Sequence, residues 1–117
     1  MSGLLLNTII IPNLPPFRAG STDGRFYNLG PDLTPLSDTV SAIVSIVVVR
    51  VDGQTIVPAD LTILATPAPY LDATRTIVNW WQTGSLFTKY LLTVTVRTTA
   101  DRTLVYDCYQ TVSAQLG

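Results

Sequence analysis

The sequence predicts an all-β fold, a two-sheet sandwich of about six to eight antiparallel strands with an extended N-terminal arm. Several short segments alternate apolar and polar residues with the period of two that is typical of half-buried strands. Turn-forming residues separate these segments at intervals of roughly ten residues, as in other sandwiches. No window of about a dozen residues shows the 3.6-residue repeat of an amphipathic helix.

The first 37 residues differ in composition from the rest of the chain. They contain five of the eight prolines, which are Pro12, Pro15, Pro16, Pro31 and Pro35. Proline fixes φ and cannot donate to a sheet ladder, so residues 1–37 are interpreted as an extended arm and residues 38–117 as the sandwich. Residues 21–24, with the sequence Ser-Thr-Asp-Gly, are expected to form a turn within the arm.

The arm is too apolar for a solvated tail, so its side chains are expected to pack on this domain or on another chain. These candidate interface residues are Leu4, Leu5, Leu6, Ile9, Ile10, Ile11, Leu14 and Phe17.

The first expected strand covers residues 40–49. Alternation places one wholly apolar set on the inner face, and its core members are Val44, Ile46 and Val48. Asp52 and Gly53 follow and predict a hairpin or tight turn. Two short strands are expected next, at residues 55–57 and 61–65, before two prolines at 67 and 69 interrupt the pattern.

A strand over residues 76–81, which follows a predicted turn at residues 72–74, contains two adjacent tryptophans. Neighbouring residues of a strand face opposite sides, so only one can enter the core. We assign Trp80 to the core, and Trp81 to an outer face that requires a cover. The cover is the arm, a partner chain or, as a weaker option, a carbohydrate.

Residues 89–98 alternate most regularly, and a turn at 99–102 leads to a last strand at residues 103–114. The expected core residues of these two strands are Tyr90, Leu92, Val94, Val96 and Cys108. Gln110 interrupts the apolar series of the last strand, which indicates a bulge near that residue.

The composition disfavours an enzyme. The chain has no histidine and no glutamate, and its single cysteine is expected in the core. The Asp residues are scattered, mostly at turn positions, where their carboxylates accept backbone N–H groups. No calcium-loop pattern and no glycine-rich phosphate loop is found. We therefore expect no catalytic residues, no metal ligands, no cofactor and no small-molecule substrate.

The charge pattern limits the expected partners. A net charge of −1 without basic clusters argues against nucleic acid, and no segment has the pattern of a signal peptide or a membrane span. Charged residues make up 13% of the chain, against about 25% in typical domains. Either Thr, Ser, Gln and Asn solvate the surface, or neighbouring subunits cover part of it.

The C-terminal half resembles a known family. Residues 71–84 read LDATRTIVNWWQTG, residues 90–99 read YLLTVTVRTT, and a turn with DRTL follows. This pattern over residues 38–114 resembles small phage virion proteins with an Ig-like domain, of the fiber–tail adaptor type. The resemblance implies an Ig-like sandwich, a location in the virion, and partners that are other virion proteins and copies of the chain itself.

Two alternatives to a tail, neck or adaptor component remain open. One is a capsid decoration protein, which differs only in having the shell as its partner. The other is a carbohydrate-binding fiber module that uses Trp81 with the nearby Asn79 and Gln82.

Overall fold

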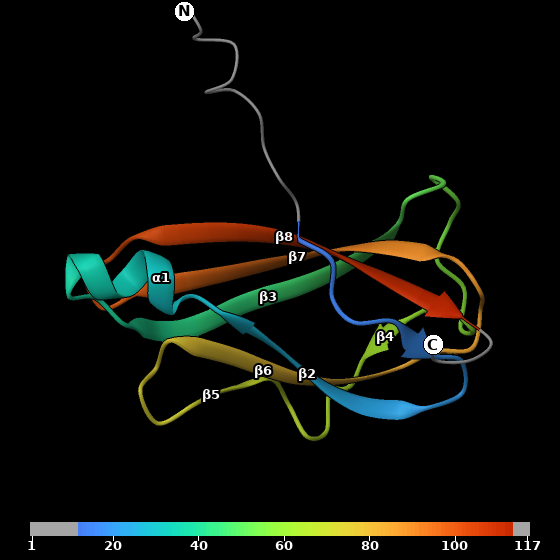
Figure 1. Ribbon diagram of the computed structural model, residues 1–117, viewed down its shortest axis with the longest axis horizontal. Coiled ribbons are helices and arrows are strands. Elements are labelled where there is room, and N and C mark those ends of the chain that lie inside the picture. Colours follow the sequence, from blue (N-terminus) through green and yellow to red (C-terminus); the bar gives the residue numbers. More distant parts are fainter. Residues whose placement is uncertain (1–11, 114–117) are drawn as a thin grey trace, which may run out of the picture.

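The computed structural model describes residues 12–113, which form two β-sheets and one short helical segment (Figure 1). The elements in chain order are β1 (Phe17–Arg18), β2 (Thr22–Asn28), α1 (Gly30–Leu33), the 3-10 turn η2 (Thr34–Leu36), β3 (Val40–Arg50), β4 (Thr62–Ile63), β5 (Tyr70–Leu71), β6 (Ile77–Thr83), β7 (Lys89–Thr98) and β8 (Thr103–Ser113). The predicted all-β class is confirmed.

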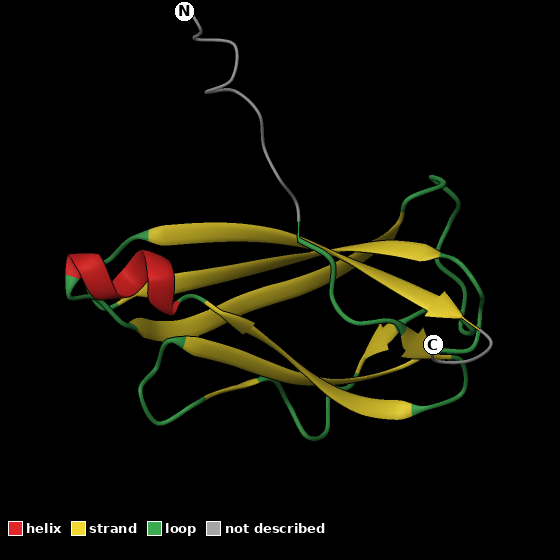
Figure 2. Ribbon diagram, viewed as in Figure 1, coloured by secondary structure: helices red, strands yellow, loops and turns green. Residues whose placement is uncertain are grey.

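The strands divide into two layers (Figure 2). The first sheet has the order β1-β8-β7-β3, and the second has the order β2-β6-β4, with β5 also pairing with β6. All pairs are antiparallel except β1 with β8, which run parallel. β1 is an edge strand of the first sheet, and β2 is an edge strand of the second sheet. Because β1 and β2 are consecutive in the chain, the turn between them connects the two sheets.

The core lies between the sheets and receives side chains from both. Six of the predicted core residues are fully buried there, namely Trp80, Tyr90, Leu92, Val94, Val96 and Cys108. Two more, Ile46 and Val48, are partly buried against this cluster. The sequence prediction is therefore confirmed on β6, β7 and β8, and on the C-terminal half of β3.

Val44 is a correction, because it does not enter the core. Its side chain is 55% exposed, while Ile43, predicted for the other face, packs against the core. The pairing of β3 with β7 shifts register between Val40 and Ala42 and again between Ile43 and Ser45. Each extra residue exchanges the two faces of the strand, so a prediction from strict alternation fails between the shifts.

The described part of the predicted arm belongs to the folded domain, so the boundary at residue 37 is wrong. β2 pairs with β6 over its whole length and covers the predicted turn at residues 21–24. The chain turns earlier, at Gly20, whose φ of +82° favours glycine. Gly24 lies under the Trp81 indole, where an added Cβ would make an ordinary contact of 3.8 Å.

Phe17 is also corrected by the structure, whereas the prediction for Leu14 stays untested. Phe17 is fully buried in the core, and Leu14 is partly buried against it, so Phe17 is not an interface residue. The remaining arm residues that were predicted to form an interface, Leu4 to Leu6 and Ile9 to Ile11, lie outside the described residues.

Three smaller expectations fail. Residues 55–57 form an exposed loop, and the strand expected at residues 61–65 is reduced to β4. Gly53 does lie in a tight turn with φ +79°, but β3 pairs with β7 rather than with the segment after that turn. Gln110 continues the inward series of β8 with no register shift and is fully buried.

Candidate functional site

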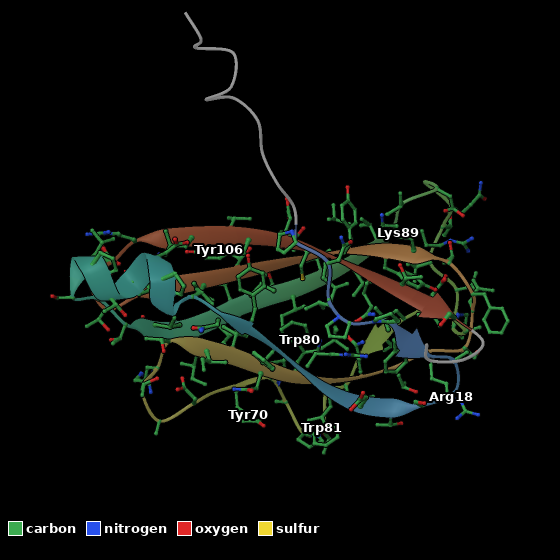
Figure 3. All side chains as sticks on the ribbon, in the orientation of Figure 1. Arg18, Tyr70, Trp80, Trp81, Lys89 and Tyr106 are labelled. Atoms are coloured by element: carbon green, nitrogen blue, oxygen red, sulfur yellow. The ribbon has the colours of Figure 1, made fainter. Side chains whose placement is uncertain are left out.

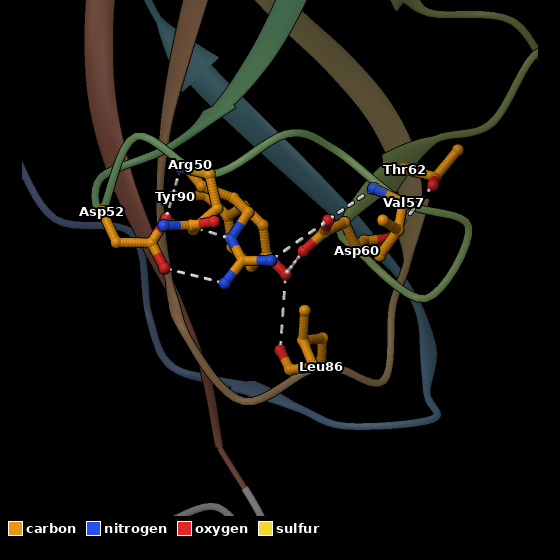
Figure 4. Close-up of polar contacts among 8 residues, drawn as sticks. Arg50, Asp52, Val57, Asp60, Thr62, Leu86 and Tyr90 are labelled. Atoms are coloured by element: carbon orange, nitrogen blue, oxygen red, sulfur yellow. Dashed lines mark hydrogen bonds and ion pairs between the residues drawn. The ribbon is translucent and has the colours of Figure 1, made fainter.

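A buried carboxylate anchors the loop after β3 to strand β7 (Figure 4). The hydroxyl of Tyr90 donates a hydrogen bond of 2.6 Å to Asp60, and the backbone N–H of Val57 donates one of 2.7 Å to the same carboxylate. The guanidinium of Arg50 lies 3.7 Å from Asp60 and also pairs with Asp52 at 2.7 Å. Asp60 and Tyr90 are fully buried, so neither side chain can contact a dissolved substrate.

The pKa values of Asp60 and Tyr90 fit a structural role for this cluster. Burial tends to raise the pKa of Asp60, but the hydrogen bonds from Tyr90 and Val57 and the charge of Arg50 hold it below its ordinary value. Burial, followed by the hydrogen bond to Asp60, raises the pKa of Tyr90 to about 12. At neutral pH the cluster therefore contains a carboxylate and a neutral phenol, and neither is poised to exchange a proton near pH 7.

A second buried polar network crosses between the sheets. Trp80 Nε1–H donates to Gln82 Oε1 at 3.0 Å, and Gln82 Nε2 donates to Gln110 Oε1 at 3.1 Å. Gln110 Nε2 then donates to the C=O of Pro15 at 2.8 Å. The network satisfies the polar atoms around the central tryptophan and fixes the segment before β1. Sequence analysis missed it, although a glutamine in phase with apolar inward residues is a possible signal for such a bond.

Asp72 caps the turn before β6, as the sequence predicted for residues 72–74. Its carboxylate accepts the N–H groups of Thr76 and Ile77 at 3.0 and 2.9 Å, and the hydroxyl of Thr74 also donates to it. The Thr74 hydroxyl and these N–H groups outweigh desolvation and lower the pKa of Asp72 to about 2.

The cap predicts a specific acid sensitivity. An unfolded aspartate has a pKa near 4, so the folded state is stabilised by ionised Asp72 above about pH 4, and this contribution is lost as the pH falls towards 2. In Asp72→Asn the amide oxygen still caps the turn but does not titrate. Urea unfolding at pH 6 and pH 2.5 is expected to show a smaller acid-induced loss in the variant. An equal loss in both proteins would contradict this interpretation.

The described residues bring together no group of three His, Cys, Asp or Glu side chains that could hold a metal ion. Burial, then the charge of Asp107, raises the pKa of the Cys108 thiol to about 11, so it is protonated at neutral pH and unsuited to nucleophilic attack. Within residues 12–113, no helix combines the length and the apolar character needed to cross a membrane.

The outer face of the second sheet carries a cluster of exposed aromatic residues, which we call the aromatic face: Phe26, Tyr70 and Trp81. Phe26 and Tyr70 lie on opposite sides of Asn79 on β6, and Trp81 is two residues further along β6. The side chains of Tyr70 and Trp81 project from the sheet away from the buried Trp80 (Figure 3). Trp81 is 36% exposed, as its predicted position on an outer face requires, and Phe26 is 60% exposed. Gln82 is not part of this face, because it is buried.

The outer face of the first sheet is also partly apolar. Val47, Val49 and Val105 are exposed there, and the ammonium of Lys89 lies 4.2 Å from the centre of the Tyr109 ring. An exposed, partly apolar sheet face marks a surface suited to contact with another protein.

A cavity of about 220 Å³ lies beside strand β2, and its walls are Leu14, Pro15, Gly24, Arg25 and Phe26. The Arg25 side chain is 10% exposed and lies 5.4 Å over the Phe17 ring. One of its terminal nitrogens donates to the C=O of Pro16 at 3.2 Å, but its Nε is buried with no hydrogen-bond partner among the described residues. The walls of the cavity are therefore mainly apolar.

From the sequence, Trp81 and the neighbouring Asn79 were expected on an outer face, and Leu14 was expected at an interface. Phe26, Tyr70 and Arg25 were missed, because their positions depend on which strands pair. The chain matches no model of a known protein family, and no curated protein sequence is significantly similar to it.

Proposed function

We propose that the chain is a structural protein of a phage particle, in the tail or neck or as a fiber–tail adaptor, with an Ig-like sandwich that binds other virion proteins and copies of itself. The observation that carries the proposal is the exposure of apolar side chains on both outer sheet faces, with Phe26, Trp81 and Tyr70 on one and Val47, Val49 and Val105 on the other. An isolated soluble domain rarely leaves two such faces uncovered.

The interior supports the same proposal. The buried ionisable and polar side chains of Asp60, Tyr90, Gln82 and Gln110 are engaged with one another or with backbone groups. Such networks rigidify a domain rather than bind a reactant. The resemblance of residues 38–114 to virion proteins with Ig-like domains supports the location in a particle.

The test is the protein composition of purified phage particles from the source of this sequence, measured by quantitative mass spectrometry. The chain is expected at a constant ratio to the tail or neck proteins. A copy number that follows the major shell protein would instead support the alternative of a capsid decoration protein. Particles that are infective and lack the chain would remove the proposal.

A carbohydrate-binding fiber module is a second candidate, which the aromatic face favours. Phe26, Tyr70 and Trp81 surround the amide of Asn79, and no charged residue lies on this face along β2 and β6. Aromatic rings with a neighbouring amide suit an uncharged sugar. Glycan-array binding that is lost in Trp81→Ala but kept in Phe87→Ala, an exposed aromatic of the β6–β7 loop, would support this candidate. Silence of the wild-type chain on the array would remove it.

A further inference from the structure

The open edge of β2 presents unpaired backbone groups beside the cavity. β2 is the end strand of the second sheet. The C=O of Trp81 accepts from the N–H of Leu64, on the side of β6 that faces away from β2. Hydrogen bonding alternates along an antiparallel pair, so Gly24, which is opposite Trp81, directs its N–H and C=O away from β6. The N–H of Gly24 indeed donates to the carboxylate of Asp23.

The same alternation applies two residues further along, at Phe26. Its N–H and C=O also point to the open edge, and its side chain forms a wall of the cavity. The edge therefore offers the N–H and C=O of Phe26 and the C=O of Gly24 within one short stretch. An extended peptide satisfies such groups by strand addition, in which backbone bonds and one side-chain pocket act together.

We infer that residues 9–11 of a second copy of this chain add to the open edge of β2, with backbone hydrogen bonds to Phe26 and Gly24 and an isoleucine side chain in the cavity. This inference deepens the proposed function and rests on it for the assembly role. Residues 1–11 lie outside the described residues, and six of them are Leu or Ile. A cavity of about 150 Å³ can hold a benzene-sized group, so the 220 Å³ beside β2 can accept one branched aliphatic side chain.

A second copy suits the geometry better than the chain's own arm. Pro12 and Leu14 are fixed along β8 through the backbone of Tyr109, and Leu14 and Pro15 already form one wall of the cavity. For its own residues 9–11 to enter the cavity, the chain would have to reverse direction at once at Pro12. The residue before a proline is restricted to extended conformations, which disfavours that reversal. The resulting contact is head-to-tail, the type that generates rings or open filaments.

The first test measures self-association of the full chain by sedimentation velocity over a concentration series. The wild-type chain is expected to associate. Phe26→Asp, at the edge, and Ile10→Asp, in the arm, are each expected to weaken association about thirtyfold or more, because a charge replaces a buried apolar group. Phe87→Asp is the matched control, since Phe87 is 62% exposed and lies in the β6–β7 loop, and it is expected to associate as the wild type does.

Mixing the two defective variants gives a sharper result. An equimolar mixture of Phe26→Asp and Ile10→Asp can form one intact junction only, so it is expected to give a dimer and no larger species. A wild-type chain that is monomeric at every concentration, or variants that associate as tightly as the wild type, would overturn the inference. Because Phe26 is exposed, its variant is expected to keep the wild-type circular dichroism spectrum and melting temperature.

A photo-crosslinker at position 26 provides a second measurement that does not depend on a destabilising change. In a mixture of ¹⁴N- and ¹⁵N-labelled chains, adducts to residues 4–11 are expected between differently labelled chains. Adducts confined to single chains would contradict the inference.

Phe26→Asp incorporated into particles at the wild-type copy number would overturn strand addition and leave the proposed function standing. Absence of the chain from particles would overturn the proposed function and leave strand addition between copies standing.

Discussion

Trp80→Ala is expected to lower the free energy of unfolding by about 4 kcal/mol, a large fraction of the about 5–15 kcal/mol typical of a folded domain. Trp80 is the largest fully buried side chain, and the truncation leaves a cavity between the two sheets. It also removes the donor to Gln82 Oε1, which leaves a buried acceptor without its partner. Urea unfolding followed by circular dichroism measures the loss.

The neighbouring tryptophan provides the matched control. Trp81 has the same chemistry and follows directly in β6, but its indole lies on the outer face above Gly24. Trp81→Ala is expected to cost about 2 kcal/mol, half the loss of Trp80→Ala, since Trp81 is 36% exposed and its removal leaves no closed cavity in the core. Equal losses in the two variants would mean that the assignment of inner and outer faces on β6 is wrong.

Asp60→Asn is expected to cost about 3 kcal/mol, the second largest effect. The substitution removes the charge opposite Arg50 and places an amide where a carboxylate accepts from both Tyr90 and Val57. An asparagine can accept at only one of these positions. If its oxygen takes the Val57 N–H, the Tyr90 hydroxyl must instead donate to the C=O of Leu86, a longer contact of 3.4 Å. Loss of one member of a buried ion pair generally costs about 3–5 kcal/mol.

Asp101→Asn is the control for this prediction. Asp101 also pairs with an arginine, Arg97, but on the exposed hairpin between β7 and β8, with 81% of its side chain exposed. A surface pair of this type contributes about 0–1 kcal/mol, and asparagine tolerates the left-handed backbone at this position, where φ is 66°. If Asp60→Asn cost no more than Asp101→Asn, Asp60 would not be the anchor described above.

The position of a strand could be predicted from the sequence where apolar and polar residues alternate without interruption. β7 covers the predicted residues 89–98, because apolar and polar side chains alternate there without interruption and no bulge intervenes on β8. In β3 both faces contain valine and isoleucine, so the sequence carried no signal for the two register shifts that expose Val44. Alternation alone cannot locate a bulge when either face could be buried.

The N-terminal part illustrates a second limit. Asp23-Gly24 has the composition of a turn, yet it lies in β2, where Asp23 pairs with Gln82 and Gly24 pairs with Trp81. The nearer of these partners is 57 positions away in the sequence, so the pairing is invisible to local propensity. Gln110 was interpreted as a break for the same reason: its partners, Gln82 and Pro15, are distant in the sequence.

The surfaces could be predicted only in part. Trp81 followed from the adjacency of two tryptophans on one strand, since one of them must face outward. Phe26 and Tyr70 lie beside Trp81 only because β2 and β5 both pair with β6. The cavity forms only because the segment before β1 lies near the open edge of β2. Both arise from long-range pairing rather than from any local motif.

In the proposed function, the exposed apolar side chains are contact surfaces within a particle. Hydroxyl-radical footprinting of the free chain and of purified particles tests it by measuring the oxidation rates of Phe26, Tyr70 and Trp81 in both states. All three side chains are expected to oxidise readily in the free chain, where they are exposed, and at least one to be strongly protected in the particle. Equal oxidation rates of all three in the free chain and in the particle would contradict the claim.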